Sequence, residues 1–161
     1  KLTDEGLVDT SDAVDFATNT LQIVTPPGNP AEVESLADLA KPGVKTVVCA
    51  PQVPCGAATA ALEKATGVDI SPVSEESSVT DVLGKVTSGE ADAGLVYVTD
   101  VTAAGDAVEG IDVPEADEAV NTYPIAPLAD SANPDAAQAF VDFVTGEVGR
   151  DVLEAAGFGQ P

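Results

Sequence analysis

Residues 45–66, KTVVCAPQVPCGAATAALEKAT, contain a β-branched run, a loop with two prolines and an alanine-rich segment. The run at 45–50 predicts a buried strand. The segment at 57–66 predicts a helix that ends at Gly67, because glycine readily adopts the left-handed backbone that closes a helix. The stretch therefore indicates a strand, a loop and a helix in succession, the unit from which parallel sheets are built.

The same pattern continues along the chain. VDISPV at 68–73 predicts a second strand, and AGLVYV at 93–98 predicts a third. Between them, apolar residues recur every three or four positions from Val79 to Val86, and SVTD at 78–81 fits a helix capping box. We therefore expect an α/β fold with a parallel-rich sheet flanked by helices. In such a sheet the carboxyl ends of the strands and the N-termini of the helices share one edge.

The segments on either side of this region carry further elements. LQIV at 21–24 predicts a strand, and AEVESLADLA at 31–40 predicts a helix. The acidic segment 104–121 predicts a loop, and NTYPIAPLA at 121–129 predicts an extended segment. These elements would complete the domain around the alternating strands and helices of residues 45–98.

Both ends of the chain read as helical. Two helices are predicted after Asn133, separated by Gly146 and ended by Gly157. KLTDE at 1–5 reads as the end of a helix stopped by Gly6. Such a beginning leads us to expect a processed or truncated piece of a longer protein.

The charge balance excludes several partners. The chain has 28 acidic and six basic residues, and its formal net charge is -22. Nucleic acid is therefore not expected as a partner, because its binding needs clustered lysine and arginine. The chain contains 44% hydrophobic residues with clear periodicity, which predicts a folded protein despite the charge. No apolar run reaches the length of a membrane span.

The absence of histidine narrows the possible chemistry. Ser-His-Asp and Cys-His catalytic sites both require a histidine, and the chain has none. Two cysteines alone cannot supply the four ligands of an ordinary zinc site. We therefore expect neither an enzyme nor a metal-cation site, and no cofactor.

The two cysteines, Cys49 and Cys55, are spaced C-x5-C around two prolines. This spacing differs from the C-x-x-C motif of thioredoxin-like enzymes. A redox pair and two free buried thiols remain alternatives, but a small structural disulfide is the favoured interpretation for an exported protein. It would hold the loop that enters the helix at Gly56.

Two predicted helix starts and one strand end could together bind an anion. Cys55 and Gly56 offer backbone N–H groups at the positive end of one helix dipole, and Ser78 with Val79 does so at the next. Tyr97 lies near the end of the strand at 93–98 and could add a hydroxyl. Ordinary capping residues and a core tyrosine are the alternative interpretation. The pattern alone indicates no more than a module that binds an oxyanion or another small ligand.

The residues also carry a resemblance to a known family. The following stretches resemble, in order, the extracytoplasmic molybdate-binding protein of ABC importers: FATNTLQIV (16–24), CAPQVPCG (49–56), SVTDVLGKVTSGEADAGLVYVTDV (78–101), YPIAPL (123–128) and AAGFG (155–159). Together they cover nearly the whole chain.

The resemblance implies a type II periplasmic-binding-protein fold and a site for molybdate or tungstate. The family holds the oxyanion through neutral donors, which correspond here to the backbone N–H groups of Cys55 and Val79 and the hydroxyl of Tyr97. Gly56 and Ser78 would support these donors at the two helix N-termini. The expected partner is the membrane permease of an ABC importer, and the expected location is extracytoplasmic. A lipid anchor on a missing N-terminal part is a further possibility.

The resemblance also implies a division into lobes. Residues 22–122 would form the complete second lobe, and residues 1–21 and 123–161 would be the remnant of a first lobe. Two serines that the family uses for its ligand belong to the part of the first lobe that this chain lacks. Two alternatives stay open: a ligand-sensing domain of a transcriptional regulator with the same fold, and a binder of another oxyanion such as sulfate.

Overall fold

The computed structural model describes residues 2–161 and divides into two compact units. Unit 2 is continuous and spans Asn19–Asn121, whereas unit 1 combines the described residues up to Thr18 with Thr122–Pro161. These divisions lie close to the predicted lobe boundaries, although the lobe assignment itself stays a prediction. No helix within the described residues is long and apolar enough to cross a membrane.

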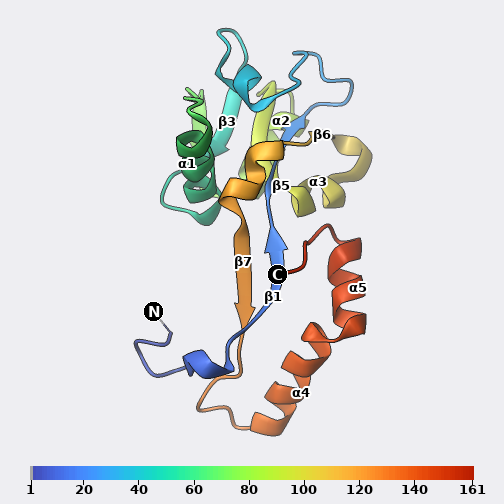
Figure 1. Cartoon of the computed structure of the whole chain (residues 1–161). Coiled ribbons are helices and arrows are strands. Elements are labelled where there is room, and N and C mark those ends of the chain that lie inside the picture. The colour runs from blue at the N-terminus through green and yellow to red at the C-terminus, as the bar shows by residue number, and fades with distance from the viewer. Residues whose placement is uncertain (1) are drawn as a thin grey trace. The chain divides into compact units, whose positions relative to one another are not determined.

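Unit 2 is built on a five-stranded mixed sheet with the strand order β4-β3-β5-β2-β6 (Figure 1). The strands are β2 (Leu21–Thr25), β3 (Thr46–Cys49), β4 (Ser74–Glu76), β5 (Ala93–Tyr97) and β6 (Glu109–Ile111). Strand β3 pairs in parallel with β4 and β5, while β2 pairs antiparallel with β5 and β6. The predicted parallel alternation is therefore confirmed at the centre of the sheet, and antiparallel pairing extends it on one side.

Helices follow each of the three parallel strands of unit 2. Helix α1 (Pro54–Thr66) follows β3, α2 (Val79–Thr87) follows β4, and α3 (Val98–Ala104) follows β5. The predicted helix from Val79 is confirmed, and its apolar face buries Val82 and Val86 completely. Short 3-10 helices lie in the connections: η2 (Leu36–Ala40), η3 (Gly105–Ala107) and η4 (Pro114–Ala119).

The core of unit 2 lies on both faces of the sheet. All five residues of β5 and all four residues of β3 are buried. Strands covered on both faces show continuous apolar runs instead of alternation, which is the pattern of VVC and AGLVY in this sequence. The largest fully buried side chains in unit 2 are Leu21, Ile23, Leu39, Leu62 and Leu95.

The predicted strand at 68–73 is wrong, because β4 begins only at Ser74. Pro72 has no N–H group for a ladder hydrogen bond, which disfavours a strand through this position. Ahead of it, the N–H of Ile70 donates to the carboxylate of Glu63 over 2.8 Å. Pairing with β3 begins after the proline, where the N–H of Val73 donates to the carbonyl of Thr46 over 2.8 Å.

The predicted helix at 31–40 is mostly absent, and only the short helix η2 forms there. Glu32 has a positive φ of 50°, which a regular helix does not allow. Further on, the carboxylate of Asp38 accepts the N–H groups of Glu34 and Ser35 over 2.8 and 2.9 Å. These contacts and the Lys41 ammonium lower the pKa of Asp38 to about 2, the hydrogen bond from Lys41 having the largest effect. Local side-chain bonds thus replace the helical ladder in this segment.

The predicted loop at 104–121 also contains regular structure. Strand β6 and helix η4 lie within it, and the preceding helix α3 has no counterpart in the predicted elements. The sequence of α3, VTDVTAA, is rich in β-branched residues, whose helix propensity is low. Its sequence therefore reads as a continuation of β5.

Unit 1 contains a two-stranded sheet and two C-terminal helices. Strands β1 (Val14–Asn19) and β7 (Asn121–Ile125) pair side by side (Figure 1). Helices α4 (Pro134–Thr145) and α5 (Glu147–Ala155) confirm the two predicted terminal helices. The short helix η1 (Thr10–Asp12) precedes β1. The ring of Tyr123 packs edge-on against those of Phe16 and Phe158.

The predicted helix end at 1–5 is not found in the described residues. Residues 2–6 form turns, in which the N–H of Gly6 donates to the carbonyl of Thr3 over 3.1 Å. Gly6 has a φ of 70°, so its left-handed backbone reverses the chain at this point. Lys1 lies outside the described residues.

Gly56 allows α1 to start directly against the end of β3. A Cβ atom at this position would come 1.9 Å from the carbonyl oxygen of Ala50 and 2.7 Å from that of Cys49. Both neighbours are backbone atoms, which cannot move aside as the end of a flexible side chain could. The first turn of α1 is therefore in direct contact with the backbone that follows β3.

We expect Gly56→Ala to lower the free energy of unfolding by about 2 kcal/mol or more, because the added methyl group overpacks this contact. The matched control is Gly84→Ala in α2, where a Cβ would meet nothing within 4 Å. That exposed helical replacement should raise stability by about 0.5–1 kcal/mol. Urea denaturation measures both changes. Equal effects of the two substitutions would contradict the close contact at Gly56.

Candidate functional site

The carboxyl ends of the three parallel strands meet at one edge of the sheet in unit 2. Cys49 at the end of β3 is in register with Glu76 at the end of β4. The ladder continues one residue further, since the N–H of Ala50 donates to the carbonyl of Glu76 over 2.8 Å. Strand β5 runs parallel to β3 on its other side and ends at Tyr97. The starts of α1, α2 and α3 consequently lie along this edge.

Helix α1 begins two residues before the predicted start at Gly56. Val53 is the N-cap residue and Pro54 occupies the first helical position, where a missing N–H group has no cost. The first N–H with a partner in this turn is that of Ala57, which donates to the carbonyl of Val53 over 2.9 Å. The N–H groups of Cys55 and Gly56 precede it and have no acceptor within the helix. Both residues are buried.

The Cys49–Cys55 disulfide predicted from the sequence is present. It joins the last residue of β3 to the first turn of α1 across a Cα–Cα distance of 5.6 Å. The two segments that the disulfide connects are the same two that touch at Gly56. A covalent link and a close backbone contact thus fix the start of α1 on the sheet edge.

Helix α2 begins with a side-chain cap at Ser78. The backbone of Ser78 is extended, with φ -155° and ψ 158°, and its Oγ accepts the N–H of Asp81 over 3.2 Å. Val79 is the first helical residue, and its N–H lies in the part of the first turn that has no intrahelical acceptor. Ser78 therefore supports the start of α2 through its side chain and leaves the amide of Val79 for another acceptor.

Tyr97 ends β5 and is held at two of its polar groups. Its N–H donates to the carboxylate of Asp100 over 2.9 Å, and its hydroxyl oxygen accepts a hydrogen bond from the side-chain amide of Asn121. The side chain is largely buried, with 9% of the residue exposed. Burial raises the pKa of Asp100, while the hydrogen bond from Tyr97 acts in the opposite direction. The hydroxyl of Tyr97 is therefore part of an organised polar group at the β5–α3 junction.

One basic side chain balances a carboxylate at this edge. The ammonium of Lys85 on α2 lies 2.6 Å from Glu76 and 2.8 Å from the hydroxyl of Ser74. The hydrogen bond from Lys85 is the main reason that the pKa of Glu76 is lowered, followed by the bond from Ser74. Glu76 thus stays ionised, and Lys85, in the last turn of α2, offsets its charge at the end of β4.

Sequence reasoning missed three residues that organise this edge: Asn121, Asp100 and Lys85. Asp100 follows a strand end at the third helical position, a placement typical of a capping residue, and could have been recognised from that spacing. Asn121 and Lys85 act through contacts with residues on other secondary-structure elements. No local pattern indicates such contacts.

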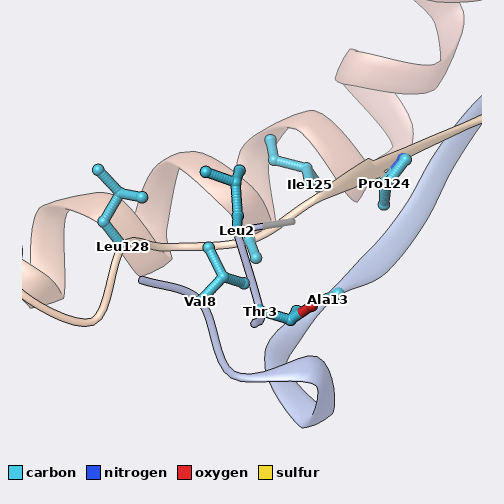
Figure 2. A pocket seen from close by; sticks show the side chains of 8 residues that line it. Leu2, Thr3, Val8, Ala13, Pro124, Ile125 and Leu128 are labelled. Carbon is cyan, nitrogen blue, oxygen red and sulfur yellow. The ribbon is translucent and has the colours of Figure 1, made fainter. Parts of the chain in front are cut away.

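A cavity in unit 1 differs in character from this edge. It has a volume of about 540 Å³, and Figure 2 shows the side chains that surround it. The lining residues are Leu2, Thr3, Val8, Ala13, Pro124, Ile125, Ala126 and Leu128. An apolar lining of this kind gives a dianion almost no hydrogen-bond donors. We therefore place the candidate site at the sheet edge of unit 2.

The family follows from comparison with known proteins. The family model of bacterial extracellular solute-binding proteins matches residues 1–159, so the chain belongs to this family. Among its curated relatives, the molybdate-binding protein ModA of Mycobacterium bovis is 51% identical over 146 residues. The match covers 91% of this chain and 56% of that protein. The chain thus spans about half the length of the curated relatives that it matches.

Solved structures support the fold class. A substrate binding domain assigned to a molybdenum ABC transporter from Clostridium difficile has a TM-score of 0.76 and 26% identity, covering 99% of this chain and 71% of that chain. The sulfate-binding protein SubI of Mycobacterium tuberculosis has a TM-score of 0.75 and 21% identity, covering 99% and 64%. The second likeness shows the fold alone. Together these structures confirm the predicted type II periplasmic-binding-protein fold.

We expect the disulfide to contribute about 2 kcal/mol to stability, because it closes a short loop in the unfolded chain. A reducing agent should lower the urea midpoint of the protein by a corresponding amount. The control is the double variant Cys49→Ala, Cys55→Ala, which should start at the lower midpoint and not respond to the reductant. A midpoint that the reductant leaves unchanged in the unsubstituted protein would show that the disulfide does not stabilise the fold.

Proposed function

We propose that this protein binds molybdate or tungstate outside the cytoplasm and delivers it to the membrane permease of an ABC importer. The observation that carries the proposal is the shared sheet edge in unit 2. There the unbonded first-turn amides of Cys55 and Val79 and the hydroxyl of Tyr97 belong to three neighbouring strand-to-helix junctions. Relatedness to ModA proteins supports the choice of ligand.

The donors suit a tetrahedral oxyanion because they are neutral and fixed. Each amide stands at the positive end of a helix dipole, and the backbone geometry sets its direction before any ligand arrives. Fixed donors in a largely buried setting interact more strongly with an anion than the same donors do in water. The binding energy can therefore come from hydrogen bonds, with no arginine or lysine among the proposed ligand residues.

The net charge of -22 does not oppose this mechanism strongly. Salt screens interactions between exposed charges beyond roughly 8–10 Å, so most of the acidic surface acts weakly on an ion in the site. Close to the edge, Lys85 offsets the charge of Glu76 at 2.6 Å. Local dipoles and hydrogen bonds then decide whether the dianion binds.

Selection among oxyanions concerns ions of similar shape and charge. Molybdate, tungstate and sulfate are all tetrahedral dianions that accept hydrogen bonds from neutral donors, and sulfate is the smallest of the three. The likeness to SubI concerns the fold and gives no preference among them. Relatedness to ModA proteins favours molybdate and tungstate. Binding of sulfate alone would contradict this preference.

The test is a calorimetric titration of the full-length protein with molybdate, tungstate, sulfate and phosphate. Heat is expected from the first two ions. Val79→Pro should then weaken molybdate binding roughly 10- to 100-fold, the value of one hydrogen bond to a charged group. Proline fits this position because Val79 is the first helical residue and Ser78 before it is extended.

The matched control is Val79→Ala, which removes the same side chain and keeps the N–H group. Its affinity should stay within about threefold of that of the unsubstituted protein, since the proposed contact is made by the backbone. Equal losses in the two variants would remove the amide of Val79 from the site. Heat from sulfate alone would replace the proposed ligand, and no heat from any of the four ions would end the proposal.

A further inference from the structure

We propose that the redox state of the Cys49–Cys55 pair regulates the affinity of the proposed site for its oxyanion. The disulfide form is the tight-binding state, and the form with two thiols is the weak-binding state. The inference rests on the proposed function, because it concerns the amide of Cys55 as a donor to the ligand. The bond joins residues that are six positions apart in the sequence and 5.6 Å apart between their Cα atoms.

One partner of the disulfide is itself a proposed donor residue. Cys55 lies in the first turn of α1, directly after Pro54, and its amide has no acceptor within the helix. Cys49 is the last residue of β3, a strand whose four residues are all buried. The disulfide therefore ties a ligand amide to a strand at the centre of the sheet.

The loop between the two cysteines keeps other attachments to the sheet. The N–H of Ala50 donates to the carbonyl of Glu76 in β4 over 2.8 Å, and the N–H of Val53 donates to the carbonyl of Ala50 over 3.1 Å. These hydrogen bonds do not depend on the sulfur atoms. We therefore expect the reduced protein to stay folded, with the start of the loop still attached to the sheet and its far end at Cys55 less firmly held.

Burial turns the loss of the bond into a displacement. Cys49 and Cys55 are 2% and 5% exposed, so their side chains lie among packed neighbours. Two thiols cannot approach each other as closely as two bonded sulfur atoms, and a packed core has little spare volume for the larger pair. A Cβ at Gly56 would come 1.9 Å from the carbonyl oxygen of Ala50, so α1 already touches the backbone after β3. Reduction therefore moves the first turn of α1 away from β3.

This movement acts on one donor and leaves another in place. The amide of Cys55 moves with the first turn of α1, and a hydrogen bond weakens steeply when its distance and angle depart from the optimum. The start of α2 has its own cap, the hydrogen bond from the N–H of Asp81 to the Oγ of Ser78. The amide of Val79 should therefore keep its place. Reduction should weaken molybdate binding about tenfold without abolishing it.

The regulating reaction is thiol–disulfide exchange. Two thiols of a low-molecular-weight reductant are oxidised to one disulfide, the S–S bond between Cys49 and Cys55 breaks, and the two cysteine sulfurs take up two electrons and two protons. Binding and reduction are linked, so the oxyanion opposes reduction by the same factor by which the disulfide favours binding. A tenfold factor corresponds to about 30 mV in the reduction potential of a two-electron couple.

The first experiment titrates the oxidised and the reduced full-length protein with molybdate in a calorimeter. The reduced sample is prepared with dithiothreitol and desalted under nitrogen, because free thiols form complexes with molybdate. Its dissociation constant should be about tenfold higher than that of the oxidised protein. The double variant Cys49→Ala, Cys55→Ala should also bind more weakly than the oxidised protein, and treatment with the reductant should not change its affinity.

The matched control for a general loss of stability is Val33→Ala. Val33 is 1% exposed and lies between the end of β2 and the start of β3, at the other edge of the sheet. Its truncation deletes buried methyl groups and lowers stability without touching the proposed site. The affinity of this variant for molybdate should stay within about twofold of that of the oxidised protein.

Amide hydrogen exchange shows whether the effect is local. The N–H of Ala57 donates to the carbonyl of Val53 in the first turn of α1 over 2.9 Å, and the N–H of Val82 donates to that of Ser78 in α2 over 3.3 Å. Reduction should speed exchange at Ala57 more than at Val82, because the disulfide restrains the start of α1 alone. Equal acceleration at the two amides would indicate a general loss of stability and would overturn the inference.

The second experiment measures the reduction potential of the cysteine pair in dithiol redox buffers, with and without saturating molybdate. Molybdate should make the potential more negative by about 30 mV, because it favours the disulfide form. The control is Val79→Pro at the same molybdate concentration. Its weaker binding should give a smaller shift, which separates binding from any direct effect of molybdate on the buffer.

The outcomes distinguish the inference from the function on which it rests. Equal affinities of the oxidised and reduced proteins, or a potential that molybdate leaves unchanged, overturn the inference. If the oxidised protein binds no molybdate, the proposed function fails, and exchange at Ala57 still decides whether the disulfide restrains the donor turn.

Loss of the fold on reduction is also a decisive outcome. If circular dichroism shows that the reduced protein is unfolded, the titrations are repeated in concentrated sucrose, which favours the compact state. Unfolding under those conditions as well overturns the inference, because the disulfide would then govern the whole fold and not the site.

Discussion

The contact between the first turn of α1 and the backbone after β3 is the constraint on which the candidate site depends. It exists because position 56 is a glycine, since a Cβ there would come 1.9 Å from the carbonyl oxygen of Ala50. The Cys49–Cys55 disulfide joins the same two segments covalently. The amide of Cys55 is thereby fixed relative to β3, and the parallel ladder relates β3 to the end of β5 at Tyr97. Rigid placement allows uncharged donors to act as an anion site.

The central fold and the positions of the proposed donors could be predicted because their signals are local. The apolar spacing from Val79 to Val86 and the cap at Ser78 identify a helix and its first residue without any tertiary information. The C-x5-C spacing favoured the disulfide that is present. Alternation of strand and helix then placed both helix starts on one sheet edge. The resemblance to molybdate-binding proteins indicated the same positions.

Features that depend on tertiary contacts could not be predicted in this way. The hydrogen bond from Asn121 to Tyr97 and the ion pair between Lys85 and Glu76 join separate elements, so no spacing reveals them. The strand predicted at 68–73 has a composition typical of strands. Because Pro72 has no N–H group for the ladder, β4 begins only after it, at Ser74. Helix α3 was missed because its β-branched residues have low intrinsic helix propensity, which its packing against the sheet overrides.

The central claim is that backbone amides at the starts of α1 and α2 hold the oxyanion. Its most direct test follows amide NMR signals of the full-length protein during a titration with molybdate. The signals of Cys55 and Val79 should shift progressively until the site is filled, because hydrogen bonding to a dianion strongly changes the environment of an amide proton. The amide of Val148 at the start of α5 should stay in place. Binding of molybdate with no shift at Cys55 and Val79, or with an equal shift at Val148, would contradict the account.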